Sequence, residues 1–498
     1  MMRKFNCLII GLFLFMLPSF AQTGITDDKI HVIFNGDHAD PSILRDGDDF
    51  YLTYSSAGKR PDLKVWHSKN LVDWTPIGYA LTENLGWIWA PDIIKYDDLF
   101  YIYFGANKYG KIYVTTSKNP AGPWSKPVLL DIKGRIDPGH ISDDKGNRYL
   151  HLNTGYMVPL SKDGLKVKGD LIKVYDGWEY PDDWEVECFC LEAPTLIRRD
   201  DYYYMSSAQG GTAGPATSHM IVTARSKSPE GPWENSPYNP LVHTYSADEE
   251  WWSKGHGTIF DDADGNWYVL YHAYRKGKTA YGRHILVERI RWTEDGWMVT
   301  ERDREKEGLF ETHYNEKITD DNFDNAALNL QWQMTNEEEW GEINYKLDGG
   351  EFTFINENEY MQTLQVSPSD KDYEVQIELG KKSGQTEVGL AIWYSETHMA
   401  GLGIQGDKVI LRSHHGRERP IKGVEGEKIR FLKIRLKDQC VNFSYSMDGI
   451  KWTMLGRSLE VSAYTNNALG GYSYLRPVIY AKGTGKASIN SFKYEPVK

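Results

Sequence analysis

Cysteine is scarce in this chain, with 4 residues among 498. Cys7 lies in the apolar N-terminal segment, which leaves Cys188, Cys190 and Cys440, an odd number that argues against a disulfide framework. No histidine stands at ligand spacing from these three residues, so the sequence does not indicate a thiolate metal site. We therefore predict that the three thiols are small buried hydrophobic residues.

Long apolar runs are also lacking. The run over residues 7–16 is too short to span a bilayer. It follows the basic residues Arg3 and Lys4 and precedes a small residue, Ala21, which is the pattern of a secretory signal peptide. Residues 1–21 are therefore predicted to be a signal peptide, and the mature protein is expected to be secreted or periplasmic, with no membrane insertion.

The chain has no excess of positive charge and no convincing long amphipathic helix. Its formal net charge is -13, which disfavours nucleic acid or an acidic membrane face as a partner. Aromatic residues, in contrast, are abundant, at 13% with 17 Trp and 32 Tyr. They suit packing between short β-strands, and they also suit neutral ligands that have apolar ring faces.

One sequence plan recurs five times in the first 300 residues. Each copy has a turn led by Pro or Gly, an apolar pair, an Asp-rich or polar turn and an aromatic strand, and the copies occupy residues 38–54, 90–103, 137–151, 193–205 and 256–271. A period of roughly 50 to 60 residues built from short strands is typical of a propeller. We predict a five-bladed β-propeller over residues 28–315, in which the starts of the repeats meet at the central axis.

The repeat is absent from residues 318–498. Strands there alternate apolar and polar residues, as in 373–379 and 428–436. This pattern predicts an antiparallel β-sandwich of jelly-roll, concanavalin-like type. The predicted fold class is therefore all-β, with a propeller followed by a sandwich.

Carboxylates stand beside the turn in three of the repeats: Asp40, Asp137 and Glu192. Hydrolysis of a glycosidic bond needs one carboxylic acid to protonate the leaving oxygen and one carboxylate on the opposite face of the sugar. A third carboxylate near the acid can raise its pKa by repulsion. Asp-Pro is also a common turn dipeptide, but three acids at corresponding repeat positions favour a catalytic role over three unrelated turns.

The ordered motifs 38–42, 89–92, 136–138, 191–194 and 255–257 resemble glycoside hydrolase family 43. Members of that family are five-bladed propellers that act on β-xylosides, α-L-arabinofuranosides and related plant-polysaccharide linkages. The resemblance covers residues 30–310. The trailing sandwich is similar to the C-terminal domain of the β-xylosidase branch.

The resemblance implies a role for each acid. Asp40 would be the general base that activates water, Glu192 the general acid, and Asp137 the residue that positions the acid and tunes its pKa. It also implies inversion of the anomeric centre, for which the acid and base carboxyls stand about 6.5–9.5 Å apart so that water fits between them. Ala193 follows the acid where many members have Gly, so the match to a subgroup is weaker.

Four further residues are predicted to bind substrate. Arg283 matches a family arginine that contacts sugar hydroxyls, and Gln209 begins a segment that resembles a family loop lining the pocket. Trp89 is a candidate stacking platform for a sugar ring, with Trp87, Trp251 and Trp252 as weaker ones. His256 resembles the histidine that many members place near the axis.

No cofactor is required under this interpretation. A structural calcium ion near His256 is a further expectation from the resemblance, with a purely structural histidine as the alternative. The acidic turn 261–266 is interpreted as a hairpin turn, because Ala273 stands where a calcium loop needs its bidentate Glu.

The leading hypothesis is thus a secreted, inverting exo-glycosidase that releases a terminal pentose from an oligosaccharide or polysaccharide. One alternative is a retaining, fructosidase-like propeller hydrolase, suggested by residues 135–138 and by Glu187-Cys188. The other is a carbohydrate-binding protein with no turnover. The sandwich could close one side of the pocket or could be an independent binding module.

Overall fold

The computed structural model describes residues 24–56, 58–106, 111–300, 310–336, 343–382 and 385–497. The predicted signal peptide, residues 1–21, lies outside these ranges. Within them, nearly all regular structure is β-strand, and helix α1 (Asn466–Leu469) has 4 residues. No helix in the described part of the chain is long and apolar enough to cross a membrane.

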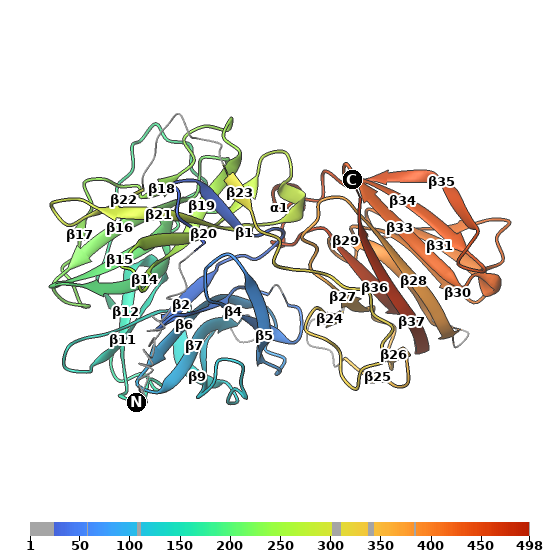
Figure 1. Cartoon of the computed structure of the whole chain (residues 1–498), viewed down its shortest axis with the longest axis horizontal. Helices are drawn as coiled ribbons and strands as arrows, with labels where there is room; N and C mark the ends of the chain where they lie inside the picture. The colour runs from blue at the N-terminus through green and yellow to red at the C-terminus, as the bar shows by residue number, and fades with distance from the viewer. Residues whose placement is uncertain are drawn as a thin grey trace, which may run out of the picture.

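Five sheets, antiparallel apart from one parallel strand pair in the fifth, form a propeller, drawn from blue to yellow-green in Figure 1. Each of the first four begins with an inner strand near the axis. The first two blades are β2 (Ser42–Asp46), β3 (Asp49–Thr53), β4 (Asp62–Ser68) and β5 (Trp74–Leu81), then β6 (Ile88–Tyr96), β7 (Leu99–Ala106), β8 (Lys111–Ser117) and β9 (Val128–Lys133). The third and fourth are β10 (Gly139–Ser142), β11 (Arg148–Leu152), β12 (Tyr156–Leu160) and β13 (Ile172–Lys173), then β14 (Glu192–Arg199), β15 (Tyr202–Gln209), β16 (Met220–Ser226), β17 (Glu234–Asn235) and β18 (Val242–His243).

The fifth blade closes the ring with strands from both ends of the propeller sequence. It contains β19 (Trp251–Asp261), β20 (Trp267–Arg275), β21 (His284–Trp292), β22 (Met298–Thr300), β1 (Ile30–Phe34) and β23 (Phe310–Thr312). Strand β1 pairs antiparallel with β21, with Phe34 opposite Ile285. This pairing joins the first and last repeats by main-chain hydrogen bonds.

The aromatic runs in the sequence form the second strands of the blades. In β20 all seven residues between Trp267 and Arg275 are buried, and β7 is buried from Phe100 to Ala106. A strand in the middle of a blade is covered on both faces by neighbouring blades, so both of its faces carry apolar and aromatic residues.

Two seven-stranded sheets form the sandwich, which lies beside the propeller in Figure 1. One sheet has the order β24 (Gln333–Asn336), β27 (Gln362–Gln365), β36 (Arg476–Lys482), β29 (Glu387–Trp393), β30 (Met399–Gln405), β31 (Lys408–Ser413) and β32 (Arg417–Ile421). The other has the order β25 (Tyr345–Leu347), β26 (Phe352–Asn356), β37 (Gly485–Pro496), β28 (Tyr373–Lys382), β33 (Phe431–Lys437), β34 (Cys440–Ser446) and β35 (Trp452–Glu460).

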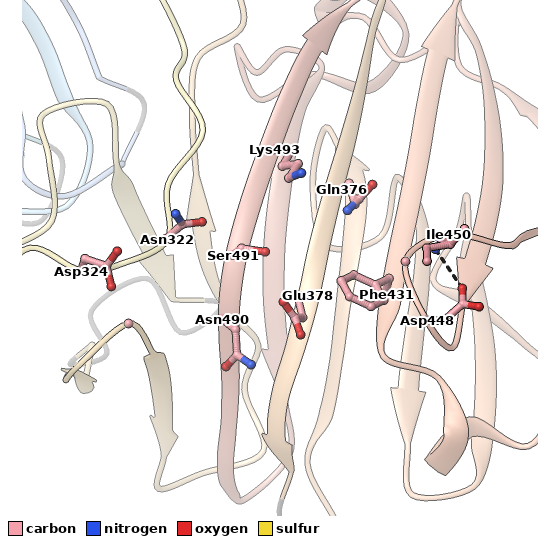
Figure 2. A pocket seen from close by; sticks show the side chains of 12 residues that line it. Asn322, Asp324, Gln376, Glu378, Phe431, Asp448, Ile450, Asn490, Ser491 and Lys493 are labelled. Carbon is pink, nitrogen blue, oxygen red and sulfur yellow. Dashed lines mark hydrogen bonds between the residues drawn. The ribbon is translucent and has the colours of Figure 1, made fainter.

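The alternation read from the sequence decides which face of the sandwich sheets is buried. On β28, Val375 and Ile377 are fully buried in the core between the sheets. Their neighbours Gln376 and Glu378 line a groove of about 440 Å³ on the other face (Figure 2). Every residue that lines this groove belongs to residues 322–493, so the groove is separate from the propeller carboxylates.

The two domains share a bonded interface. Arg60 and Met334 exchange two main-chain hydrogen bonds of 2.8 and 2.7 Å, and the main-chain N–H of Leu475 donates to Ala280 at 2.8 Å. In addition, Lys64 of β4 donates to Glu316, which lies in the connection between the two domains, at 3.0 Å, and both side chains are buried. Burial acts to raise the pKa of Glu316, but Lys64 and His38 outweigh it and lower that pKa to about 2.

We expect the substitution Glu316→Gln to lower the free energy of unfolding by about 3–5 kcal/mol, because it leaves the buried Lys64 charge uncompensated. Since the pKa of Glu316 lies below its unfolded value, the contribution is present above about pH 4.5 and is lost as the pH falls toward about 2. Urea denaturation at pH 7 and at lower pH measures both effects. The double variant Lys64→Met/Glu316→Leu is the control and should recover most of the loss. A loss of less than ~1 kcal/mol in the single variant, the range of an exposed pair, would contradict this account.

Candidate active site

The same backbone conformation recurs at the start of each of the five sequence repeats. Asp40, Ala90, Asp137, Ala193 and His256 each have a positive φ, between 42° and 57°. Each stands directly before a proline or, in the last repeat, a glycine. The left-handed region costs an L-residue roughly 1–2 kcal/mol, so it persists where the surrounding structure enforces it.

This conformation shows that one prediction is wrong, namely that the three acids stand at corresponding positions of their repeats. Asp40 and Asp137 both occupy the left-handed position, but Glu192 precedes it, and Ala193 takes that position in the fourth repeat. The three acids are therefore not at equivalent repeat positions. They nevertheless meet in one place, because residues at the turn and just before it face the same cavity.

That cavity has a volume of about 270 Å³ at the centre of the propeller. It is lined by Asp37, Ala39, Asp40, Ser55, Trp87, Trp89, Ile136, Asp137, Glu192, Thr212, His256, Arg283 and Tyr472. Six of the seven site residues proposed from the sequence are in this set, and Gln209 is not. Trp87 is also in the wall, whereas Trp251 is 1% exposed and packs in the core of the fifth blade.

Asp40 is surrounded by donors. Arg283 donates to one carboxylate oxygen at 3.0 Å, and the Ser55 hydroxyl donates to the other at 2.6 Å. The main-chain N–H of Asp40 donates to Nδ1 of His272 at 3.0 Å. Burial acts to raise the pKa of Asp40, but Arg283, followed by His256 and His272, holds it well below its usual range. Burial also lowers the pKa of both histidines, so Arg283 is the cation that keeps Asp40 ionised near neutral pH.

Arg283 is itself held by the segment that follows β1. Its main-chain N–H donates to the Asp37 carboxylate at 2.9 Å, and its carbonyl accepts from the N–H of His38 at 2.8 Å. Gly282 has φ +85°, and a Cβ there would lie 2.4 Å from Cβ of Asp37. Only glycine allows this close approach, which brings Arg283 against Asp40.

Glu192 and Asp137 are two further carboxyl groups, and their electrostatic environment differs from that of Asp40. The main-chain N–H of Ala193, next to Glu192, donates to Asp137 at 3.1 Å. Burial, then repulsion by Asp40 and Glu187, raises the pKa of Glu192 to about 7. Burial, then repulsion by Glu192 and Asp40, raises the pKa of Asp137 well above its usual value. The two carboxyls therefore titrate together and retain a proton close to neutral pH. One pocket thus holds an ionised carboxylate and a protonated carboxyl pair.

Residues 31–298, which contain the whole pocket except Tyr472, match the family model for glycosyl hydrolases family 43. The chain belongs to this family. Residues 320–495 match the model for the beta xylosidase C-terminal concanavalin A-like domain. The family 43 assignment confirms the predicted enzyme class, a glycoside hydrolase, and the predicted fold class.

Relatives match along nearly the whole chain. A xylan 1,3-beta-xylosidase from a Vibrio species is 25% identical and covers 86% of this chain and 90% of its own length. A non-reducing end alpha-L-arabinofuranosidase from Bacteroides ovatus is 28% identical and covers 93% of each chain. The crystal structure of a family 43 protein from Bacillus licheniformis superposes with a TM-score of 0.80 at 26% identity, over 94% of this chain and 100% of that one.

The family 43 pocket is completed by the sandwich. Tyr472, in the loop after α1, is part of the wall, and its ring centre lies 5.5 Å from the Arg283 guanidinium carbon. This loop is tied down, because the Tyr472 N–H donates to Asn466 at 2.8 Å and Asn467 donates to the Gly214 carbonyl at 3.3 Å. The sandwich therefore closes one side of the pocket. No pattern in the sequence pointed to Tyr472, which is a single residue from another domain.

Gln209 lies behind the pocket wall. It is fully buried, and its amide accepts from the Trp178 N–H at 2.8 Å and donates to the Trp178 carbonyl at 3.0 Å. The predicted loop reaches the pocket three residues later, at Thr212. The sequence analysis also missed Ser55 and His272, which the fold brings to Asp40, and Asp37, which the fold brings to Arg283.

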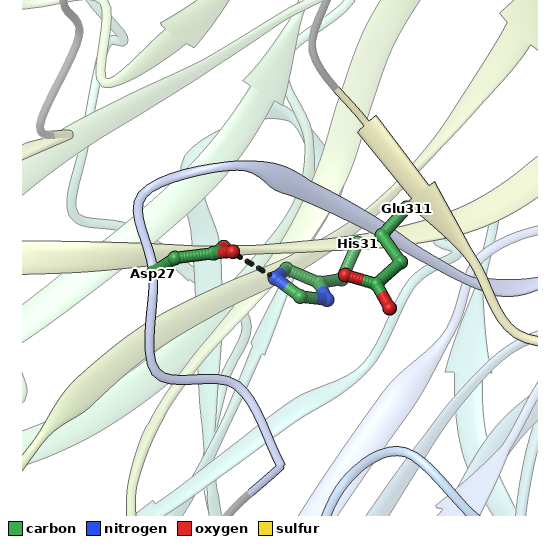
Figure 3. Close-up of side chains that lie close together, drawn as sticks. All are labelled: Asp27, His31 and Glu311. Atoms are coloured by element: carbon green, nitrogen blue, oxygen red, sulfur yellow. Dashed lines mark hydrogen bonds and ion pairs between the residues drawn. The ribbon is translucent and has the colours of Figure 1, made fainter.

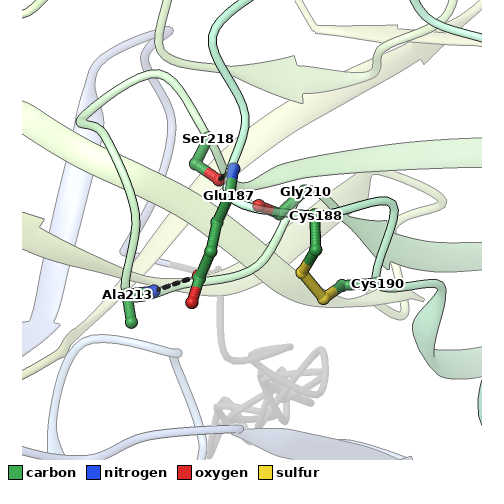
Figure 4. Close-up of a disulfide and its surroundings, with 6 residues drawn as sticks. All are labelled: Glu187, Cys188, Cys190, Gly210, Ala213 and Ser218. Carbon is green, nitrogen blue, oxygen red and sulfur yellow. Dashed lines mark hydrogen bonds between the residues drawn. A yellow bond between two sulfur atoms is a disulfide. The ribbon is translucent and has the colours of Figure 1, made fainter. Parts of the chain in front are cut away.

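The prediction that the three cysteines are buried free thiols is wrong for two of them. Cys188 and Cys190 form a disulfide beside Glu187 (Figure 4), and Cys440 is half-buried on β34. An odd cysteine count argues against a framework of several bridges but not against one local bridge with a single thiol left over. The bridge lies in the segment that leads into Glu192.

The surroundings of His256 suit a calcium ion poorly. Its Nδ1 lies 3.4 Å from Asp40, and the rings of His219 and His272 lie close by. This set is rich in nitrogen, whereas calcium takes six to eight oxygen ligands. A cluster of potential metal ligands in the described residues, Asp27, His31 and Glu311, lies on the fifth blade instead (Figure 3). There Lys29 lies 3.1 Å from Asp27 and 3.8 Å from Glu311, so it already compensates both charges.

We expect Tyr472→Ala to lower kcat/KM for an aryl pentoside by about tenfold, the order of one lost aromatic contact of a substrate ring. Tyr472→Phe should lose less, because the ring stays in the wall. Steady-state kinetics of both variants, with Tyr345→Ala on the sandwich as the exposed control, gives the comparison. Equal activity of Tyr472→Ala and the control would show that the sandwich does not form part of the working pocket.

Proposed function

We propose that the chain is a secreted, inverting exo-glycosidase that releases a terminal pentose from plant oligosaccharides or polysaccharides. The observation that carries the proposal is the contrast within one pocket between ionised Asp40 and the protonated Glu192–Asp137 pair. Two carboxyls held in different electrostatic environments are what acid–base hydrolysis of a glycoside needs. The names of the Vibrio and Bacteroides relatives, a β-xylosidase and an α-L-arabinofuranosidase, support a pentose as the released sugar.

In this mechanism Asp40 is the general base. Its carboxylate takes a proton from a water molecule while the water oxygen attacks the anomeric carbon. Glu192 is the general acid and gives its proton to the glycosidic oxygen as the bond from that oxygen to the anomeric carbon breaks. The products are a free pentose with inverted configuration and a shortened glycan, and solvent returns the proton from Asp40 to Glu192.

The remaining residues have supporting roles. Asp137 accepts from the Ala193 N–H, next to Glu192, and so fixes the backbone that carries the proposed acid. Arg283 keeps Asp40 ionised and offers its remaining donors to sugar hydroxyls. Trp89 and Trp87 offer aromatic faces to the apolar side of the sugar ring. No calcium step enters this mechanism, and a calcium ion near His256 stays a prediction.

The shape of the pocket supports exo action. Its volume of about 270 Å³ is below the ~300–1,000 Å³ of sites for drug-sized ligands, so it suits one sugar ring rather than a chain. Tyr472 closes one side of it. A terminal residue can enter such a pocket, whereas the interior of a polysaccharide cannot pass through it.

The two alternatives have less support. The fructosidase-like alternative is suggested in part by Glu187, but the Glu187 side chain accepts from the Ala213 N–H at 2.9 Å and is not in the pocket wall. A binding protein without turnover has no need for carboxyls with opposite pKa shifts. Export is proposed on the pattern of residues 1–21 alone, and N-terminal sequencing of the mature protein tests it.

We expect Asp40→Asn and Glu192→Gln each to lower kcat for an aryl pentoside with a poor leaving group by about 10²–10⁴-fold. With a dinitrophenyl leaving group, which departs without protonation, Glu192→Gln should recover most of its activity and Asp40→Asn should not. In the wild type, kcat/KM should fall as the pH rises through about 7, because the Glu192–Asp137 pair loses its proton there.

The measurements are steady-state kinetics with both leaving groups and a pH–rate profile. Asp98→Asn, in an exposed turn, is the matched control and should behave as the wild type. Near-normal turnover of the poor substrate by either active-site variant would remove that residue from its assigned role.

We expect the first pentose released to have the configuration opposite to that of the substrate. Proton NMR of the anomeric signals during the first minutes of hydrolysis, before mutarotation, gives the answer. Retained configuration would favour the covalent route of fructosidase-like enzymes and would make Asp40 a nucleophile instead of a base.

A further inference from the structure

An exposed aromatic pair lies on the segment between β13 and β14 that leads directly into Glu192. Phe189 is 43% exposed. The half-buried Tyr180 stacks with it, at a ring-centre distance of 6.0 Å and an angle of 27°. Single exposed apolar residues are ordinary, whereas apolar side chains that form a contiguous exposed patch mark binding surfaces.

The segment is held firmly, so this exposure does not come from a loose loop. The Cys188–Cys190 disulfide brackets Phe189, and the Gly210 N–H donates to the Phe189 carbonyl at 3.2 Å. The buried Gln209 amide pins Trp178 through two hydrogen bonds. A Cβ at Gly177 would lie 2.7 Å from the Phe189 ring, so glycine there leaves room for the ring.

The segment that carries Phe189 is bonded to a loop of the catalytic pocket. The Glu187 carboxylate accepts from the Ala213 N–H, and its own N–H donates to Ser218 at 2.7 Å (Figure 4). These bonds join the Phe189 segment to the loop that places Thr212 in the pocket wall. Phe189 thus stands three residues from the proposed acid, Glu192, on a segment bonded to the rim of the pocket.

More aromatic rings extend the surface away from the pair. Trp178, next to Gly177, lies 6.0 Å from Trp184. Trp184 stacks on His243 at 4.3 Å and lies 6.1 Å from Tyr245, which is 52% exposed. A run of ring faces beside a small pocket suits an extended ligand that is itself made of rings.

We propose that Phe189 and Tyr180 form a stacking platform for the part of the glycan that leaves, namely the sugars on the far side of the cleaved bond. This inference rests on the proposed function. The pocket holds the terminal sugar, so the rest of the chain must cross its rim, and sugar rings present apolar C–H faces to aromatic side chains. The platform makes the enzyme selective for oligosaccharides over substrates with a small leaving group.

The test compares two substrates of one pentose. The first is a pentosyl fluoride, whose leaving group is too small to reach the platform, and the second is a linear pentose tetrasaccharide. For Phe189→Ala we expect kcat/KM to fall about tenfold on the tetrasaccharide and to stay within about twofold of the wild type on the fluoride. Phe189→Trp should keep the wild-type ratio, whereas Phe189→Leu should behave as Phe189→Ala. Tyr360→Ala, an equally exposed aromatic residue at 43% on the sandwich, is the matched control.

Two kinetic results for Phe189→Ala would overturn the platform: an equal loss of kcat/KM on both substrates, or no loss on either. A wild-type dimer that becomes a monomer in Phe189→Ala, as measured by sedimentation, would also overturn it, because the pair would then be a contact between copies of the chain. If the wild type cleaves neither substrate, the proposed function fails, and tetrasaccharide binding by calorimetry then decides about the platform alone. Binding about tenfold weaker in Phe189→Ala than in Tyr360→Ala supports it, and equal binding overturns it.

Discussion

The pairing of β1 with β21 is the constraint on which the active site depends. It closes the ring of blades by joining the first strand of the propeller to one near its end, with Phe34 opposite Ile285. Directly beyond this register, the chain places Asp37 against Gly282 and Arg283 against Asp40. The ion pair that ionises Asp40 therefore needs the closed ring, because its two residues come from the two chain segments that close it.

Charge in the pocket is divided rather than uniform. One cation, Arg283, hydrogen-bonds to Asp40 and not to the other two acids, so it outweighs the effect of burial on the pKa only at Asp40. Asp40 is stabilised as an anion, and that anion in turn helps to keep the Glu192–Asp137 pair protonated. The acid and base functions of the site are thus coupled through Arg283, which contacts only one of them.

The sandwich completes the pocket from outside the ring of blades, and a loop of the fourth blade holds it there. Tyr472 comes from the sandwich, and Asn467 beside it is bonded to the loop that follows Thr212. Glu187 accepts from the N–H of the adjacent residue of that loop, Ala213. Walls held in this way fit the proposal that the pocket takes one terminal sugar, with the proposed aromatic platform beside it for the remainder of the glycan.

The sequence by itself determined the architecture and most of the chemistry. Repeats and alternation are local patterns, so five blades and a sandwich could be read from residue order, and so could Asp40, Asp137 and Glu192, because each adjoins a repeated turn. The tertiary structure alone decided that Arg283 is the cation that keeps Asp40 ionised, that Gln209 lies behind the wall, and that Tyr472, Ser55 and His272 belong to the site. The physical reason is that pKa and pocket membership depend on contacts between residues far apart in the chain, and such contacts leave no periodic trace in the order of the residues.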